Sequence, residues 1–68
     1  MPIKITVNGV TQAATKGQTV LGLLEQLAID PARVAVELDR RIVKQPLWRE
    51  TRLQTGAQIE IVQFVGGG

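Results

Sequence analysis

Apolar and polar residues alternate along three separate stretches of the chain, at residues 3–7, 34–38 and 59–65. Successive side chains of a β-strand point to opposite faces of its sheet, so a period of two predicts a strand with one buried face. In the last stretch Ile59 and Ile61 share one face. The pattern therefore predicts a strand near each end of the chain and a third one in the middle.

Two short turns join these stretches to further strands. Asn8-Gly9 follows the first stretch and is the strongest short-range hairpin signal, so we expect an antiparallel strand over about residues 10–14. Asp39-Arg40 follows the middle stretch and predicts a turn into a short partner strand over residues 41–43. Farther on, Pro46-Leu47-Trp48 suits an irregular or 3₁₀ turn.

Between the two hairpins the apolar period changes to that of a helix, with apolar residues at Val20, Leu23, Leu24 and Leu27. This i, i+3, i+4, i+7 spacing puts all four side chains on one helical face. Thr19 is placed to cap the helix, because its hydroxyl can accept a hydrogen bond from a backbone N–H of the first turn. We expect the helix to end at Asp30-Pro31.

The element order is therefore β-β-α-β-β-β, which is an α+β class with a single main helix. The simplest architecture lays that helix across one face of a mixed sheet, with the first and last strands parallel at its centre. This is the β-grasp, or ubiquitin-like, arrangement. We expect residues 1–65 to form it and residues 66–68 to be a flexible glycine tail. The uncovered face of the sheet would then present Val62 and Phe64 to solvent.

Composition excludes several classes of function. The chain has 68 residues, no cysteine and no histidine, so zinc sites built on Cys or His and nucleophilic sites that use a histidine base are absent from it. The six carboxylates are scattered, with no spacing that suggests acid/base catalysis or a metal site. A net charge of +2 is no nucleic-acid signature, and no apolar run has bilayer-spanning length. We expect a cytoplasmic protein that binds neither nucleic acid nor membrane.

The chain ends on Gly66-Gly67-Gly68, directly after the last predicted strand. Residues without a Cβ form a thin tether that can thread a narrow channel in another protein. The reactive group would be the terminal carboxylate of Gly68, activated by attack on the α-phosphate of ATP to give an acyl-adenylate. The alternative is a frayed end without function.

Other surface residues have competing interpretations. An exposed apolar patch at Val62, Phe64 and Val65 would let a partner hold the domain while the tail enters its active site, although ordinary strand packing also explains these residues. Trp48 has two interpretations, an anchor for an interface or a plug that closes one end of a small core, and a large aromatic after a Pro turn favours the plug. The basic residues form either a docking patch for an acidic partner or a solvated face; they are Arg40, Arg41, Lys44, Arg49 and Arg52.

Three segments carry a resemblance to a known family: Gln18-Thr19-Val20 to Leu23-Leu24, Val34-Ala35-Val36-Glu37-Leu38, and Ile59-Glu60-Ile61-Val62-Gln63-Phe64-Val65-Gly66-Gly67-Gly68. Together, and over the whole chain, they resemble the ThiS family, the sulfur carriers of thiamine biosynthesis. The chain departs from the family pattern at two turns, Asp39-Arg40 and Gly56-Ala57, where an Asn-Gly-like turn and a Gly-Asp are frequent. Both departures leave the glycine tail untouched.

The resemblance implies a carrier and co-substrate instead of an enzyme, with no cofactor bound by this chain. A ThiF-like adenylyltransferase would use ATP and magnesium to adenylate Gly68, and sulfur would then replace AMP to give a thiocarboxylate. Thiazole synthase, the ThiG-like partner, would receive the sulfur. Gly66 and Gly67 would act as the tether, and Val62, Phe64 and Val65 as the partner-binding surface.

Three alternatives share the fold. The small subunit of molybdopterin synthase uses the same chemistry but tends to be longer. A protein modifier would use the same adenylate to form isopeptide bonds with lysines. A plain β-grasp binding module would leave the glycines inert. Because the downstream enzyme sets the selectivity, the residues of this chain do not separate thiamine from other sulfur pathways, nor identify the sulfur donor.

Overall fold

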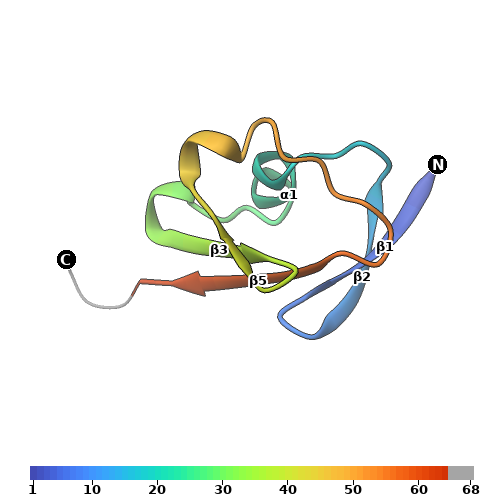
Figure 1. Cartoon of the computed structure of the whole chain (residues 1–68), viewed down its shortest axis with the longest axis horizontal. Coiled ribbons are helices and arrows are strands. Elements are labelled where there is room, and N and C mark those ends of the chain that lie inside the picture. The colour runs from blue at the N-terminus through green and yellow to red at the C-terminus, as the bar shows by residue number, and fades with distance from the viewer. Residues whose placement is uncertain (65–68) are drawn as a thin grey trace.

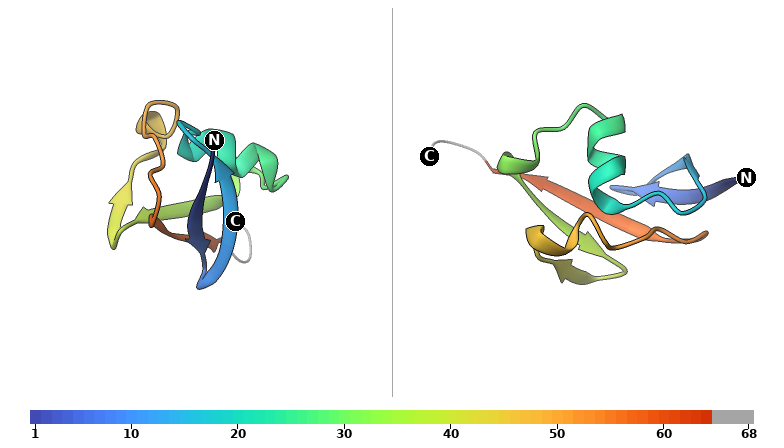
Figure 2. Two further views of the ribbon diagram at one scale, coloured as in Figure 1. Left: turned by 90° about the vertical axis from the view of Figure 1, so that its right-hand side faces the viewer. Right: turned by 90° about the horizontal axis from the view of Figure 1, so that it is seen from above.

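The computed structural model describes residues 1–64, and in them five strands form one mixed sheet with a single α-helix across one face (Figures 1 and 2). The elements are β1 (Pro2–Val7), β2 (Val10–Thr15), α1 (Val20–Gln26), η1 (Pro31–Arg33), β3 (Val34–Leu38), β4 (Arg41–Val43), η2 (Gln45–Leu47) and β5 (Gln58–Gln63), where η1 and η2 are 3₁₀ turns. This is the predicted β-grasp order. None of the helical segments in residues 1–64 has the length and apolar character needed to cross a membrane.

The last strand lies in the middle of the sheet, whose strand order is β2-β1-β5-β3-β4. On one side β5 runs parallel to β1, with Thr6 opposite Gln58. On the other side it runs antiparallel to β3, with pairs from Leu38 and Ile59 to Val34 and Gln63. The predicted parallel pairing of the first and last strands at the centre is confirmed. As a result, β5 carries the chain away from the end of the molecule at which β1 begins (Figure 1).

Helix α1 begins as predicted but ends earlier. The hydroxyl of Thr19 accepts a hydrogen bond from the backbone N–H of Gly22 at 3.0 Å. The predicted end at Asp30-Pro31 is wrong, because Ala28 adopts a left-handed conformation with φ 58° and stops the helix. The N–H groups of Ala28 and Ile29 turn back to carbonyls of the last helical turn, which satisfies those carbonyls. Asp30-Pro31 instead begins η1.

The core lies between α1 and the inner face of the sheet. Trp48 is only 3% exposed and donates its indole N–H to the carbonyl of Val43 at 2.7 Å, so the prediction of a plug is confirmed. A buried Trp usually finds such an acceptor, because an unpaired indole N–H would be costly. The side chains with relative exposure under 2% are Ile5, Val20, Leu23, Leu24, Val36 and Ile59.

Both predicted hairpin turns form with two consecutive residues at positive φ. Asn8 and Gly9 have φ of 50° and 83°, and Asp39 and Arg40 have φ of 51° and 70°. Two such residues make a type I′ turn, whose twist matches that of the flanking strands. Asn and Asp tolerate this conformation, whereas for Arg40 it is strained, because its Cβ approaches the carbonyl oxygen.

Candidate functional site at the end of β5

The end of β5 is fixed on its β3 side by the backbone. The N–H of Phe64 donates to the carbonyl of Arg33 at 2.8 Å. This bond continues the β3–β5 ladder one residue beyond β5, so Phe64 still lies in the plane of the sheet. The acceptor belongs to η1, the turn that leads into β3. The structure therefore defines where the chain leaves the domain.

On the β1 side, the side chain of Asn8 fixes the end of β5 by hydrogen bonds. Its Oδ1 accepts from the N–H of Ile61 at 2.7 Å, and its Nδ2 donates to the carbonyl of the same residue at 3.1 Å. An amide side chain carries one acceptor and a donor group, so it can pair with both polar groups of one peptide position. We call this pair of bonds the Asn8 clamp. It holds β5 two residues before its last residue, Gln63.

The start of β5 has a related contact from the other hairpin. The Oδ1 of Asp39 accepts from the N–H of Gln58 at 3.0 Å, and the N–H of Asp39 donates to the carbonyl of Gln58 at 2.8 Å. Each hairpin turn thus uses its first residue to hold the backbone of β5. Asp39 does so at the start of the strand and Asn8 toward its end.

The face of the sheet opposite α1 carries apolar side chains beside the end of β5. Val62 is 56% exposed and Phe64 is 62% exposed, as the alternating pattern predicts. Ala35 pairs with Val62 across the β3–β5 ladder and extends the same surface. We call Ala35, Val62 and Phe64 the exit patch. The remaining predicted site residues lie outside the described residues; they are Val65, Gly66, Gly67 and Gly68.

Two carboxylates border the exit patch on the same face. Glu37 and Glu60 lie directly opposite each other on β3 and β5. Like charges in this position repel and destabilise the free sheet. Beyond them, Ile42 on β4 pairs with Glu37 and is 74% exposed. The open face therefore combines apolar side chains with a central pair of negative charges.

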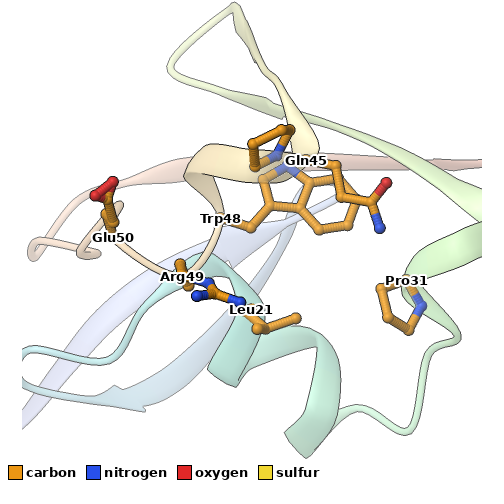
Figure 3. Close-up of a pocket in the computed structure, with 7 residues that line it drawn as sticks. Leu21, Pro31, Gln45, Trp48, Arg49 and Glu50 are labelled. Carbon is orange, nitrogen blue, oxygen red and sulfur yellow. The ribbon is translucent and has the colours of Figure 1, made fainter.

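Three arginines of the predicted basic patch line different hollows of the surface. One of them, of about 670 Å³, lies between α1, η1 and η2 and is lined by Leu21, Pro31, Gln45, Pro46, Trp48, Arg49 and Glu50 (Figure 3). Arg41 and Arg52 line other hollows. All five basic residues are exposed, which a docking patch and a solvated face have in common, so the choice between the two stays a prediction.

Comparison with known proteins decides the family. The model of the ThiS family matches residues 5–68, which is most of the chain and takes in the terminal glycines. The chain belongs to the ThiS family. The sulfur carrier protein ThiS of Escherichia coli is 35% identical over 66 residues, covering 97% of this chain and 100% of the relative. This is the family that the sequence resemblance indicates.

The fold of the ThiS family agrees as well. The crystal structure of the thiamine biosynthesis protein ThiS from Geobacter metallireducens has a TM-score of 0.85 and 28% identity, covering 97% of this chain and all of that one. Thiazole synthases from Magnetococcus marinus and Paramagnetospirillum magneticum are 41% and 35% identical over 66 residues. The chain spans only about a fifth of the length of these two relatives, because the match covers 20% of each.

The Asn8 clamp is the feature of the site that sequence reasoning missed. Asn8 was interpreted only as half of a hairpin turn, and its contact with Ile61 spans 53 positions of the sequence. The one available signal is chemical: an Asn at the first position of a type I′ turn leaves its amide free to pair with a neighbouring strand. The residues around Asn8 do not predict which strand its side chain will contact.

Proposed function

We propose that this chain is a sulfur carrier whose terminal Gly68 carboxylate is converted to a thiocarboxylate for thiazole formation in thiamine biosynthesis. The observation that carries the proposal is the family match over residues 5–68, together with a fold in which the central strand leads directly toward the glycines. A central strand held on both edges gives the tail a rigid base, while the three glycines give it the slenderness to enter a narrow channel.

The chemistry follows from the weakness of a carboxylate as an electrophile. A carboxylate oxygen of Gly68 attacks the α-phosphate of ATP, pyrophosphate leaves, and an acyl-adenylate forms. Sulfur at the sulfide level, such as hydrosulfide, then attacks the acyl carbon, AMP leaves with the C–O bond electrons and a proton is released, which gives the thiocarboxylate. A ThiF-like adenylyltransferase that uses ATP and magnesium supplies the catalytic groups, so this chain acts as a protein co-substrate. We place the reaction in the cytoplasm.

Thiazole synthase is the proposed recipient of the sulfur. Two proteins of that name contain a region similar to this chain. A carrier and the enzyme that consumes its sulfur gain from being close together, because linkage raises the effective concentration of the tail at the active site. This arrangement supports thiazole synthase over molybdopterin synthase as the partner of the present chain.

The exit patch is the proposed docking surface for these enzymes. A partner that covers the apolar side chains exposed beside the base of the tail also brings its own surface next to the tail. Val62 and Phe64 therefore couple binding of the domain to insertion of Gly68. Val65 follows Phe64 directly in the sequence and is proposed to contribute to the same docking surface.

The proposal is tested by the intact mass of the protein after incubation with ATP, magnesium, a cognate adenylating enzyme and a sulfur source. A chain that lacks Gly68 is the matched control. We expect a mass shift that corresponds to one oxygen exchanged for sulfur, present only in the full chain. An unchanged mass, with no AMP adduct, would contradict the carrier role.

A further inference from the structure

Strand β5 is held near its two ends by one residue from each hairpin turn. Asn8 binds the backbone of Ile61 through two side-chain hydrogen bonds, and Asp39 binds Gln58 through its carboxylate and its own N–H. The two residues have nearly equal backbone conformations, with φ of 50° and 51°. They differ in the part of β5 that they hold, because Gln58 begins the strand and Ile61 is close to its end.

The Asn8 clamp extends the pairing of β5 beyond the reach of β1. Strand β1 ends at Val7, and the last backbone bond on this edge runs from the N–H of Asn8 to the carbonyl of Ile59 at 2.8 Å. The side chain of Asn8 then adds the next rung at Ile61. Without it, Ile61 and the residues that follow would be paired only on the β3 side, where the ladder continues to the bond between Phe64 and Arg33.

Fixing Ile61 also fixes the exit patch. Strand β5 runs to Gln63 and the bond from Phe64 to Arg33 continues its ladder, so the orientation of the Ile61 peptide helps to set the face to which Val62 and Phe64 point. It also determines the direction in which the chain leaves the sheet. A strand end that is hydrogen-bonded to β3 alone can twist about that ladder. A partner that binds the tail must remove this freedom, which costs conformational entropy and weakens binding.

We propose that Asn8 is a positioning residue for the reactions of the C-terminal tail. The Asn8 clamp presets the direction in which the chain leaves β5 and the exposure of the exit patch, so that the activating enzyme receives both in one geometry. This inference rests on the proposed function. It assigns to Asn8 a task in partner binding that its place in a hairpin turn does not require.

The test compares Asn8→Gly with Asp39→Gly. Glycine accepts the positive φ of both positions, so each turn is retained while the side-chain bonds to β5 are removed, two for Asn8 and one for Asp39. The assays are hydrogen exchange of individual amides and steady-state adenylation by a cognate adenylating enzyme, with the carrier concentration varied. Thermal unfolding confirms that both variants are folded under the assay conditions.

We expect a reciprocal pattern. In Asn8→Gly the Ile61 amide loses its acceptor and exchanges about fivefold or more faster, and in Asp39→Gly the Gln58 amide does so. For adenylation, Asn8→Gly raises the KM for the carrier by about fivefold and leaves kcat unchanged, because the lost order is restored once the tail is bound. Asp39→Gly leaves both constants near those of the wild type.

A third variant separates the two bonds of the Asn8 clamp. Asn8→Asp keeps an acceptor for the N–H of Ile61 but replaces the donor to the Ile61 carbonyl by a carboxylate oxygen that repels it, so its KM should lie above that of the wild type. It also replaces Asn8→Gly in the comparison if the glycine variant does not fold.

The outcomes are distinct. Equal KM values for the wild type and Asn8→Gly, with adenylation intact, would overturn the inference and leave the proposed function standing. Equal increases in KM for Asn8→Gly and Asp39→Gly would also overturn it, because they would show a general loss of stability. A wild-type chain that is not adenylated at all would overturn the proposed function and, with it, this inference.

Discussion

Replacing Phe64 by alanine removes most of the exit patch without disturbing the core. The side chain is 62% exposed. A large aromatic side chain presents about 150–250 Å² of surface, so roughly 90–150 Å² of Phe64 is available to a partner. At about 25 cal/mol per Å², covering that area contributes about 2–4 kcal/mol to binding. Alanine keeps part of it, so we expect a loss of about 2 kcal/mol, or roughly thirtyfold in affinity.

The assay is ATP-dependent adenylation by a cognate adenylating enzyme over a range of carrier concentrations. Phe64→Ala should lower kcat/KM by roughly thirtyfold while the free energy of unfolding changes by less than about 0.5 kcal/mol, because the substitution is at the surface. Ile42→Ala is the matched control, since Ile42 is even more exposed on the same face but lies on β4, away from the exit. A kcat/KM for Phe64→Ala within about twofold of the wild type, or an equal loss for Ile42→Ala, would refute the assignment of the exit patch.

Three further predictions follow from single residues. Arg40→Gly should raise the free energy of unfolding by about 1 kcal/mol and Tm by about 4–8 °C, because glycine has no Cβ to strain at positive φ. Arg40→Ala keeps the Cβ and should leave Tm unchanged. Equal Tm values for the two variants would contradict this explanation. Glu60→Gln should raise the free energy of unfolding by about 0.2–1 kcal/mol in urea titrations by removing the repulsion from Glu37, and a decrease would show that the repulsion is absent. Gly67→Val should slow sulfur transfer by about a hundredfold, since a branched side chain displaces the tail in a narrow channel; full transfer in a single-turnover assay would count against the tether.

Most of the fold could be predicted because its signals are local. The turn at Asn8-Gly9 and the turn at Asp39-Arg40 are set by neighbouring residues, and the alternation in the strands needs only a period of two. The bounds of β3 and β4 match the prediction for the same reason. The parallel pairing of β1 with β5 followed from the need of one helix to cover one sheet.

The parts that were missed depend on tertiary contacts or on rare backbone conformations. Ala28 stops α1 in a left-handed conformation that alanine seldom adopts, so its sequence gives no signal. The Asn8 clamp joins residues 53 positions apart. At the exit, the acceptor for Phe64 is the backbone carbonyl of Arg33, a group that every residue carries, and only the register of β3 and β5 selects it.

The central claim is that sulfur passes from Gly68 of this chain into a thiazole. The most direct test prepares the thiocarboxylate with heavy-isotope sulfur, adds thiazole synthase and its remaining substrates, and follows the label by mass spectrometry in a single turnover. We expect the label to leave the carrier and to appear in the thiazole product in equal amount. Label that stays on the carrier, or a carrier joined to lysines of other proteins, would contradict it.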